Sequence, residues 1–264
     1  WTHMLRASCL RLAPHAQPAA FARPLLSTSS SASRPRFPAA AMPGGGASSS
    51  RPRSAAAAMP GGPSSTPPKV LVPIADGSEE MEAVIIIDLL RRAGAAVTVA
   101  SVEPGRNTVV CSRGVKIEAD ASIDDPAVKA AQDSWDAVAL PGGMPGAERL
   151  RDCLPLTDAV ESAQRRGAVW AAICASPAVA WAPRGWLAGR AATAHPAFME
   201  VLATAAPGGP ACNARASEGR VVVDGTLITS RGPGTAFEFG LALVAALCGE
   251  EKAAEVAGPL VLPK

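Results

Sequence analysis

Short apolar runs rich in β-branched residues alternate with helix-length amphipathic segments from Lys69 onward. Four runs have the length and continuous apolar character of buried strands: Lys69–Ala75, Ala95–Val102, Trp135–Gly143 and Ala168–Cys174. Three segments have helical periodicity or helical punctuation: Glu79–Gly94, Asp158–Gly167 and Ala236–Cys248. Strands that alternate with helices predict βαβ units. We therefore expect one doubly wound α/β domain, with a mainly parallel sheet covered by helices on both faces.

Turn and cap signals add detail to this expectation. The segment 108–120 suggests a short hairpin or edge pair, and Asp224-Gly225 is a strong hairpin signal. Thr235 and Glu238 have the spacing of a capping box before the last predicted helix, which Gly249 can close.

Residues 1–68 differ sharply in composition from the rest of the chain. They contain seven Arg and no Asp or Glu, so the remainder holds 18 basic and 23 acidic residues, a net charge of about −5. This balance argues against a nucleic-acid-binding domain. The leader is also rich in Ser, Pro and Ala, and we expect it to be disordered.

An acid-free leader rich in Arg and Ser is typical of an organellar transit peptide. The basic start Met4–Ala13 favours a mitochondrion, whereas the long Ser/Pro/Ala continuation also suits a chloroplast. An untranslated region or a mispredicted first exon is the alternative, and a start at Met59 would give a cytosolic form. No apolar run reaches the roughly 18 residues needed to span a membrane, so no membrane partner is expected.

Cysteine and histidine usage restricts the chemistry. The six Cys are scattered without a C-x-x-C pair, which argues against a disulfide framework or a thiolate metal site and favours a reducing compartment. His195 is the one histidine after the leader, so a multi-histidine zinc site within one chain is excluded.

Cys174 occupies the turn after a predicted buried strand. In doubly wound sheets, binding sites form at the carboxyl ends of the strands, here the turns after Ala75, Leu140 and Ile173. Ser176 is a suitable N-cap and Pro177 a suitable first helical residue, so we expect the thiol beside a helix N-terminus. That position would lower the pKa of the thiol and supply a nucleophilic thiolate. The alternative is an inert buried cysteine.

Glu79, Glu80 and Glu82 follow the first of these turns. Acids in the first turn of a helix usually complement its dipole and stay in solvent. Glu82 borders the apolar stripe, however, and could face the cysteine turn as a carboxyl that keeps its proton and donates a hydrogen bond. Both alternatives remain open from the pattern alone.

Two glycines, Gly142 and Gly143, end the third predicted strand and let backbone N–H groups approach a substrate. The N–H groups of Gly143 and Ala175 could form an oxyanion site. The G-x-G-x-x-G spacing is absent, and the segment 230–235 has no phosphate-loop Lys. We therefore expect no nucleotide cofactor and no metal.

Seven motifs, in this order along the chain, resemble the DJ-one branch of the ThiJ/PfpI superfamily in its plant-type form. They are GSEEMEAV, LRRAGAAVTVASV, CSRGV, LPGGMPGAERLRDC, AAICASPAVA, ATAHPAF and TSRGPGTAFEFGLALV. The resemblance covers about Lys69 to Leu262. It implies a flavodoxin-like fold, usually homodimeric, in residues 69–264, with a reactive cysteine on a nucleophile elbow.

The resemblance also implies roles for individual residues. Cys174 matches the reactive thiol, Glu82 the carboxylic acid hydrogen-bonded to it, and His195 a nearby histidine. Gly143 and Ala175 match the backbone positions around the oxyanion pocket, beside Gly142.

Two arginines, Arg92 and Arg113, match residues near the dimer interface and the cysteine turn. Ser176 departs from the pattern, because the elbow often has Gly there. Ala175 stands where the protease-like relatives have a His, which weakens a peptidase interpretation.

The function that the resemblance implies is a cofactor-independent glyoxalase acting on methylglyoxal and glyoxal, with lactate and glycolate as products. Deglycation of adducts on proteins would be the same chemistry on a bulkier substrate. The alternative is an oxidative-stress sensor or chaperone whose thiol is oxidised to a sulfinate. A cysteine peptidase is the least favoured hypothesis.

Overall fold

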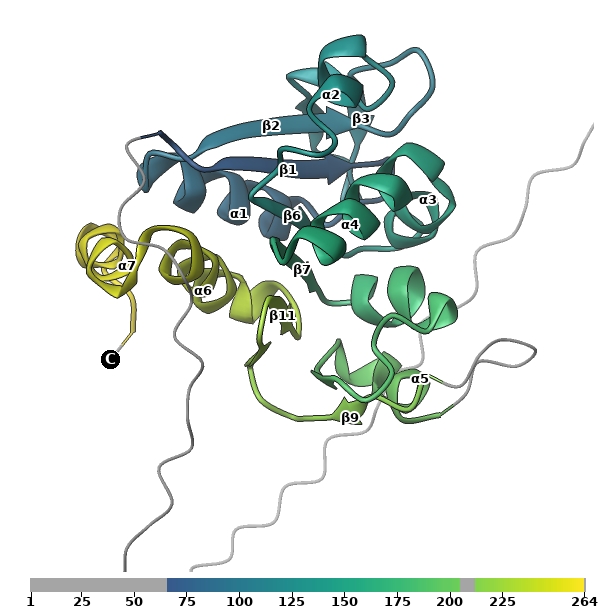
Figure 1. Ribbon diagram of the computed structural model, residues 1–264, viewed down its shortest axis with the longest axis vertical. Coiled ribbons are helices and arrows are strands. Elements are labelled where there is room, and N and C mark those ends of the chain that lie inside the picture. Colours follow the sequence, from purple (N-terminus) through teal and green to yellow (C-terminus); the bar gives the residue numbers. More distant parts are fainter. Residues whose placement is uncertain (1–65, 205–211, 264) are drawn as a thin grey trace, which may run out of the picture. The chain divides into compact units, whose positions relative to one another are not determined.

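The computed structural model describes residues 66–204 and 212–263, and its ribbon is shown in Figure 1. Its main sheet contains the strands β1 (Lys69–Ile74), β2 (Ala96–Ser101), β5 (Ala121–Ser122), β6 (Ala137–Leu140), β7 (Val169–Ile173), β10 (Val221–Asp224) and β11 (Leu227–Ser230). Two small two-stranded sheets contain β3 (Thr108–Val110) with β4 (Lys116–Glu118), and β8 (Ala191–Ala192) with β9 (Arg215–Ala216).

The strand order of the main sheet is β10-β11-β7-β6-β1-β2-β5. Every neighbouring pair is parallel except β10 and β11, which form an antiparallel hairpin around Gly225 and Thr226. The strongest signal for that hairpin was Asp224-Gly225, and this prediction is confirmed. The antiparallel pair β3–β4 confirms the second predicted hairpin.

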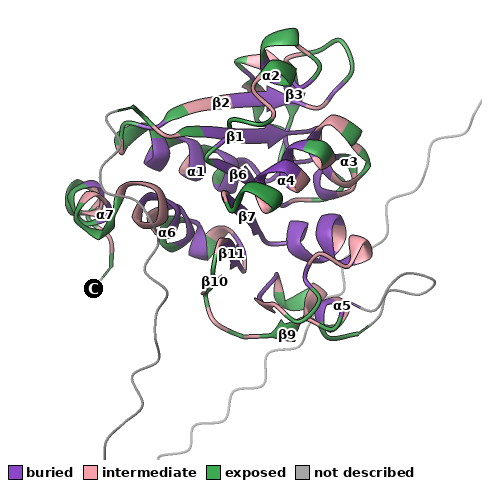
Figure 2. Ribbon diagram, in the orientation of Figure 1, coloured by how far each residue is buried: buried purple, intermediate pink, exposed green. Residues whose placement is uncertain are grey.

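Helices cover both faces of the sheet. They are α1 (Glu80–Arg92), α2 (Pro126–Ala130), α3 (Gly146–Asp152), α4 (Leu154–Arg166), α5 (Met199–Ala203), α6 (Ala236–Cys248) and α7 (Glu250–Ala257). One apolar core joins alternate residues of β1, such as Val70 and Val72, to α1, α6 and α7. The other core joins Leu71 of the same strand to α3 and α4. The buried residues therefore follow the central strands (Figure 2), as the predicted doubly wound α/β fold requires.

The start of α6 differs from the prediction. Thr235 precedes the helix, but Glu238 forms an ion pair with Arg220 (Oε1 to Nε, 2.9 Å) instead of completing a capping box. The hydroxyl of Thr235 instead accepts the N–H of Gly232 at 3.1 Å. The predicted capping box is therefore wrong. The predicted end of the helix is confirmed, since Gly249 follows it with φ 91°.

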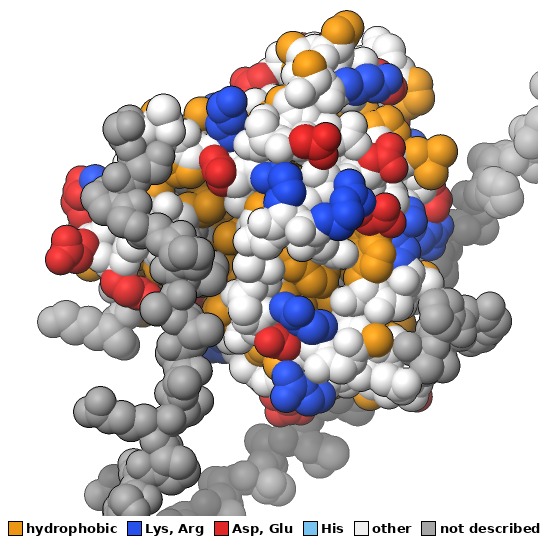
Figure 3. Space-filling model, in the orientation of Figure 1, with side chains coloured by type: hydrophobic (Ala, Val, Ile, Leu, Met, Phe, Trp, Pro, Cys, Tyr) orange, Lys and Arg blue, Asp and Glu red, His pale blue; other side chains and the backbone are white. Residues whose placement is uncertain are grey.

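The surface carries charges of both signs. Lys and Arg are interspersed with Asp and Glu on the face shown in Figure 3. No helix in the described ranges is both long enough and apolar enough to cross a membrane. Residues 1–65 of the predicted leader, with the alternative start at Met59, lie outside the described residues.

Candidate active site

Cys174 follows the last residue of β7 in a strained backbone conformation. Its φ is 65°, which non-glycine residues seldom adopt and which often marks functional turns. The N–H of Cys174 donates to the carbonyl of Ser230 at 3.0 Å, and its own carbonyl accepts the N–H of His195 at 2.8 Å. The turn is thus held by two neighbouring segments, and this is the local geometry of a nucleophile elbow.

Ser176 does not cap the helical turn that follows. The turn Pro177–Trp181 is of π type and begins at Pro177, as predicted, but Ser176 itself has helical backbone angles. Its fully buried hydroxyl donates to the carbonyl oxygen of Pro141 at 2.5 Å. The predicted N-cap is therefore wrong, because this side chain binds the turn after β6 rather than its own helix.

Glu82 faces Cys174 from the first turn of α1. Its carboxyl is fully buried, and its Oε2 accepts the N–H of Gly142 at 2.7 Å. A Cβ on Gly142 would lie 2.5 Å from the Cys174 Cβ and 2.9 Å from that Oε2. Gly142 therefore lets the Glu82 carboxyl lie close to the thiol of Cys174, and the second carboxyl oxygen, Oε1, is buried with no hydrogen-bond partner among the described residues.

The three acids of this turn are buried, contrary to the expectation that first-turn acids stay in solvent. Glu79 is the N-cap residue of α1, and its Oε2 accepts the N–H of Glu82 at 2.7 Å. Glu80 binds the segment before β4, where it accepts the Ser112 hydroxyl and the Arg113 N–H, both at 2.9 Å. These two structural roles were not predicted from the sequence. The signal available for them was three acids in four residues beside an apolar stripe.

Burial dominates the protonation of Glu82. It raises the pKa of the carboxyl to about 7, and the nearby charge of Glu79 acts in the same direction. The hydrogen bond from the Gly142 N–H and the adjacent Cys174 thiol oppose the rise. A carboxyl that keeps its proton close to neutrality agrees with the sequence-based hypothesis for Glu82.

The pKa of the Cys174 thiol is raised, not lowered as predicted. The residue is only 9% exposed, and burial together with the Glu82 carboxylate raises its pKa to about 12. The N–H groups of Gly143 and Ala175 act in the opposite direction but do not outweigh these causes. The pair therefore holds one proton and one negative charge between pH about 7 and about 12. A thiolate forms within that state when the proton passes from sulfur to Glu82.

The two predicted oxyanion donors, the N–H groups of Gly143 and Ala175, face the sulfur, whereas the neighbouring Gly142 has another role. The N–H groups of Gly143 and Ala175 are placed to hydrogen-bond the thiolate of Cys174. The N–H of Gly142 is used by Glu82. Gly143 has φ 92°, and a Cβ there would lie 2.4 Å from the carbonyl oxygen of Gly77, so the turn requires glycine.

His195 adjoins the elbow through its backbone. Its N–H binds the Cys174 carbonyl, and its Nδ1 accepts the N–H of Ala197 at 3.2 Å. Because Nδ1 is the acceptor, Nε2 is the nitrogen that can exchange a proton with a bound molecule. The imidazole is half-buried and lies in edge contact with Phe198.

The two predicted arginines lie in different places. The N–H of Arg113 binds Glu80, so this residue lies beside the first turn of α1. Arg92 lies in the last turn of the same helix and pairs with Asp88 (Nε to Oδ2, 2.5 Å). At 1.5 Å per residue, Arg92 is about 15 Å along the axis from Glu82. Within one chain the structure does not bring Arg92 to the cysteine turn, and its expected place near a dimer interface stays a prediction.

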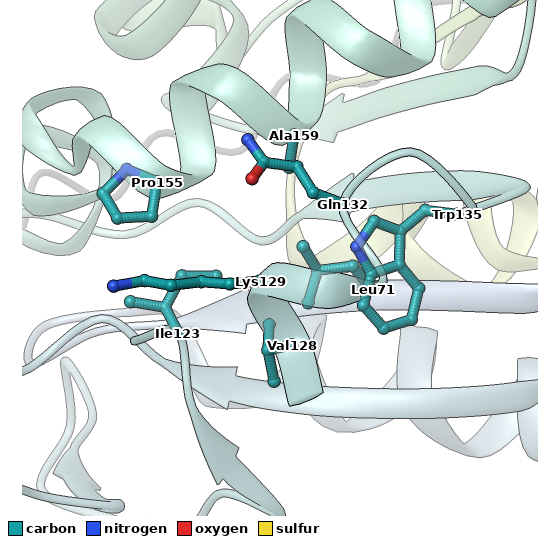
Figure 4. A pocket seen from close by; sticks show the side chains of 8 residues that line it. All are labelled: Leu71, Ile123, Val128, Lys129, Gln132, Trp135, Pro155 and Ala159. Atoms are coloured by element: carbon teal, nitrogen blue, oxygen red, sulfur yellow. The ribbon is translucent and has the colours of Figure 1, made fainter. Parts of the chain in front are cut away.

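A cavity on the α4 side of the sheet is separate from this site. Figure 4 shows its lining side chains: Leu71, Ile123, Val128, Lys129, Gln132, Trp135, Pro155 and Ala159. Its volume of about 10 Å³ leaves room for about one water molecule. It contains neither Cys174 nor Glu82 and is too small for an organic substrate.

Comparisons with known proteins agree with the fold. Residues 68–246 match the DJ-1/PfpI family. Protein DJ-1 homolog B of Arabidopsis thaliana is 48% identical over 199 residues, which are 75% of this chain and 42% of that protein. The chain spans less than half the length of the two Arabidopsis relatives that it matches.

Two further relatives are matched over nearly their whole length. The glutathione-independent glyoxalase DJR-1.2 of Caenorhabditis elegans is 34% identical, over 74% of this chain and 96% of that protein. The crystal structure of Drosophila melanogaster DJ-1beta has a TM-score of 0.67 and 40% identity, over 75% of this chain and 100% of that one.

Proposed function

Because the chain belongs to the DJ-1/PfpI family, we propose that it is a glutathione-independent and cofactor-independent glyoxalase. Its substrates would be 2-oxoaldehydes, with methylglyoxal giving lactate and glyoxal giving glycolate. The observation that carries the proposal is the buried pair of Glu82 and Cys174, which retains one proton beside two backbone N–H groups. The named activity of the Caenorhabditis relative supports the same reaction class.

The first step is addition of sulfur to the aldehyde. The Cys174 sulfur bonds to the aldehyde carbon while its proton passes to Glu82. The carbonyl oxygen takes the displaced electron pair as an alkoxide, which the N–H groups of Gly143 and Ala175 stabilise. Glu82 then returns the proton to this oxygen and leaves a hemithioacetal.

The second step moves a proton between adjacent carbons. The Glu82 carboxylate removes the proton from the carbon bonded to sulfur, and that C–H electron pair forms a carbon–carbon double bond. The ketone oxygen takes a proton from His195, which gives an enediol. Glu82 returns its proton to the neighbouring carbon, and the hydroxyl on the sulfur-bearing carbon gives its proton back to His195. Water then cleaves the resulting thioester and frees the thiol.

The test is lactate formation from methylglyoxal without glutathione. Cys174→Ser and Glu82→Gln should each lower kcat by at least about 100-fold, because one removes the nucleophile and the other the proton carrier. Cys153→Ser is the matched control, since it removes another thiol that does not touch Glu82 and should keep turnover. Full turnover in both site variants would disprove the mechanism. The same variants assayed on glycated peptide would show whether the chemistry extends to bulkier adducts.

A second candidate function uses the same thiol as a peroxide sensor. A Cys174 sulfinate would accept the N–H groups of Gly143 and Ala175 and a hydrogen bond from protonated Glu82. Two peroxide molecules would each give one oxygen to sulfur and leave as water. Intact mass after peroxide treatment tests this function, and a Cys174 that stays reduced while other cysteines gain oxygen would count against it.

We also propose that a second copy of the chain covers the outer face of α1. Met81 is 55% exposed and Val84 is 50% exposed on this helix, and Val110 and Val115 are exposed on the neighbouring β3–β4 hairpin. Large exposed apolar side chains on neighbouring elements are typical of a surface that another chain covers. A homodimer across this face would bury them beside Arg113.

For residues 1–68, the composition supports import into a mitochondrion or a chloroplast. This proposal concerns location only and is independent of the chemistry at Cys174.

A further inference from the structure

Ser176 forms a contact that a glycine at this position could not make. Its side chain is fully buried, and its hydroxyl donates to the Pro141 carbonyl oxygen at 2.5 Å across 35 positions of sequence. The bond joins the elbow after β7 to the turn after β6. A buried hydroxyl with one well-placed acceptor holds both segments in register.

The acceptor of this bond belongs to the peptide group that binds Glu82. The carbonyl of Pro141 and the N–H of Gly142 are the two ends of one planar amide. That N–H donates to Oε2 of Glu82 at 2.7 Å. A hydrogen bond accepted by an amide carbonyl polarises the amide and strengthens the bond that its N–H donates. The chain of contacts thus runs from the Ser176 hydroxyl through one peptide to Glu82, and from Glu82 to Cys174.

We propose that Ser176 is a positioning residue that acts through the Pro141–Gly142 peptide to stabilise the Glu82 carboxylate. It thereby sets the equilibrium between the form with the shared proton on Glu82 and the form with that proton on Cys174. The inference rests on the proposed function only for its consequence in catalysis, since the division of the proton can be measured without turnover.

The other groups around the pair are few. Glu79 acts on Glu82 from the N-cap of α1, and Cys174 faces it from the elbow. His195 adjoins the elbow from the segment after β8, through its backbone. In the described part of the chain the printed hydrogen bond of the Ser176 hydroxyl goes to Pro141 and to none of these three. Its removal therefore changes the pair mainly through the peptide.

Loss of the hydroxyl has a specific signature. A weaker hydrogen bond from the Gly142 N–H stabilises the Glu82 carboxylate less. The pair of Glu82 and Cys174 therefore loses its first proton at higher pH. The sulfur then carries a larger share of the remaining negative charge. Below the midpoint, the amount of thiolate beside a protonated Glu82 does not change, because the weakened bond affects the carboxylate form. The pH midpoint of thiol reactivity and its high-pH plateau therefore rise together, while the low-pH rates coincide.

The experiment is the pH profile of iodoacetamide alkylation at Cys174, followed by peptide mass. In Ser176→Ala we expect a midpoint about 0.5 pH unit above the wild-type value and a plateau rate about threefold higher, since both follow from a threefold weaker acidity of Glu82. Rates at about pH 5.5, well below the midpoint of about 7, should match those of the wild type. Ser176→Gly should shift in the same direction, and Ser176→Thr, which keeps the hydroxyl, should restore the midpoint.

Ser162→Ala is the matched control. Ser162 is a buried serine on α4 whose hydroxyl donates to Asp133 at the same distance, 2.5 Å, without contact to the pair. It should leave the profile unchanged. An unchanged midpoint in both Ser176→Ala and Ser176→Gly would overturn the proposal, as would a uniform rate increase at every pH, which indicates a merely loosened elbow. A shifted midpoint in a protein that forms no lactate would support the positioning role and refute the glyoxalase function.

Discussion

Glu80 and Glu82 are two residues apart in one buried turn, yet their protonation is opposite. Burial alone would raise the pKa of Glu80, but hydrogen bonds from the Ser112 hydroxyl and the Arg113 N–H lower it below its usual range. Glu82 accepts one backbone N–H and faces a thiol, and burial raises its pKa to about 7. The number of donors that each carboxyl receives decides whether it keeps its charge. Glu80 is therefore a structural anion, whereas Glu82 can carry a proton.

The largest expected effect concerns the pH dependence of stability. The folded pKa of Glu82 is raised, so the folded state holds this proton over the range in which the unfolded chain releases it. The free energy of unfolding should fall by about 3 kcal/mol between pH about 4.5 and about 7, and Glu82→Gln should remove that fall. Urea unfolding at pH 5 and pH 8 measures both. If Glu82→Gln were less stable than the wild type at pH 8, the free-energy cost assigned to the buried Glu82 carboxylate would be contradicted.

The matching change on the other side of the turn should have the opposite sign. Glu80→Gln replaces an ionised acceptor, so it should lower the free energy of unfolding at pH 7 by about 2 kcal/mol. Because the folded pKa of Glu80 is lowered, its contribution is present above the usual value of 4.5 and is lost as the pH falls through the folded value. Urea unfolding at pH 7 and pH 3 should therefore show a larger difference at the higher pH. If Glu80→Gln were as stable as the wild type at pH 7, the assigned role of Glu80 as a stabilising anion would be contradicted.

The smallest effect concerns Met81, which lies between the two acids and points outward. A charge there should oppose the proposed dimer, and Met81→Glu should weaken self-association by about tenfold, or about 1.4 kcal/mol. Leu154→Glu on α4 is the control, since it places the same charge at another exposed apolar residue. Sedimentation over a range of protein concentrations distinguishes them. Equal dissociation constants for both variants and the wild type would place the interface elsewhere.

Much of the site could be predicted because it lies at the ends of easily recognised elements. Continuous apolar runs can become only buried strands or buried helices, and their lengths identified β1, β6 and β7. Cys174 directly follows β7, and the Gly142-Gly143 pair follows β6 after Pro141, so parallel pairing brings them together. The family motifs then distinguished Glu82 from its neighbours, which hydrophobic pattern alone could not do.

The errors come from partners that are distant in sequence. The sequence predicted that Ser176 is a helix N-cap, but in the structure its hydroxyl donates to the Pro141 carbonyl oxygen at 2.5 Å. The thiol was expected to be acidic because its helical turn was visible in the sequence, whereas its burial beside Glu82 was not. Glu79 and Glu80 were expected in solvent, and the β3–β4 hairpin and the turn after β6 enclose them.

The sequence by itself determined the order of strands and helices and the position of the cysteine in the chain, since local periodicity and turn residues depend on neighbouring residues only. The tertiary structure decided which carboxyl keeps a proton, which hydroxyl hydrogen-bonds one turn to another, and how the thiol titrates. These properties depend on desolvation and on hydrogen-bond donors from segments 30 to 60 residues away. The physical reason is that the free energy of a charged group depends on the solvent exclusion and the hydrogen-bond donors around it. That environment exists only in the folded chain.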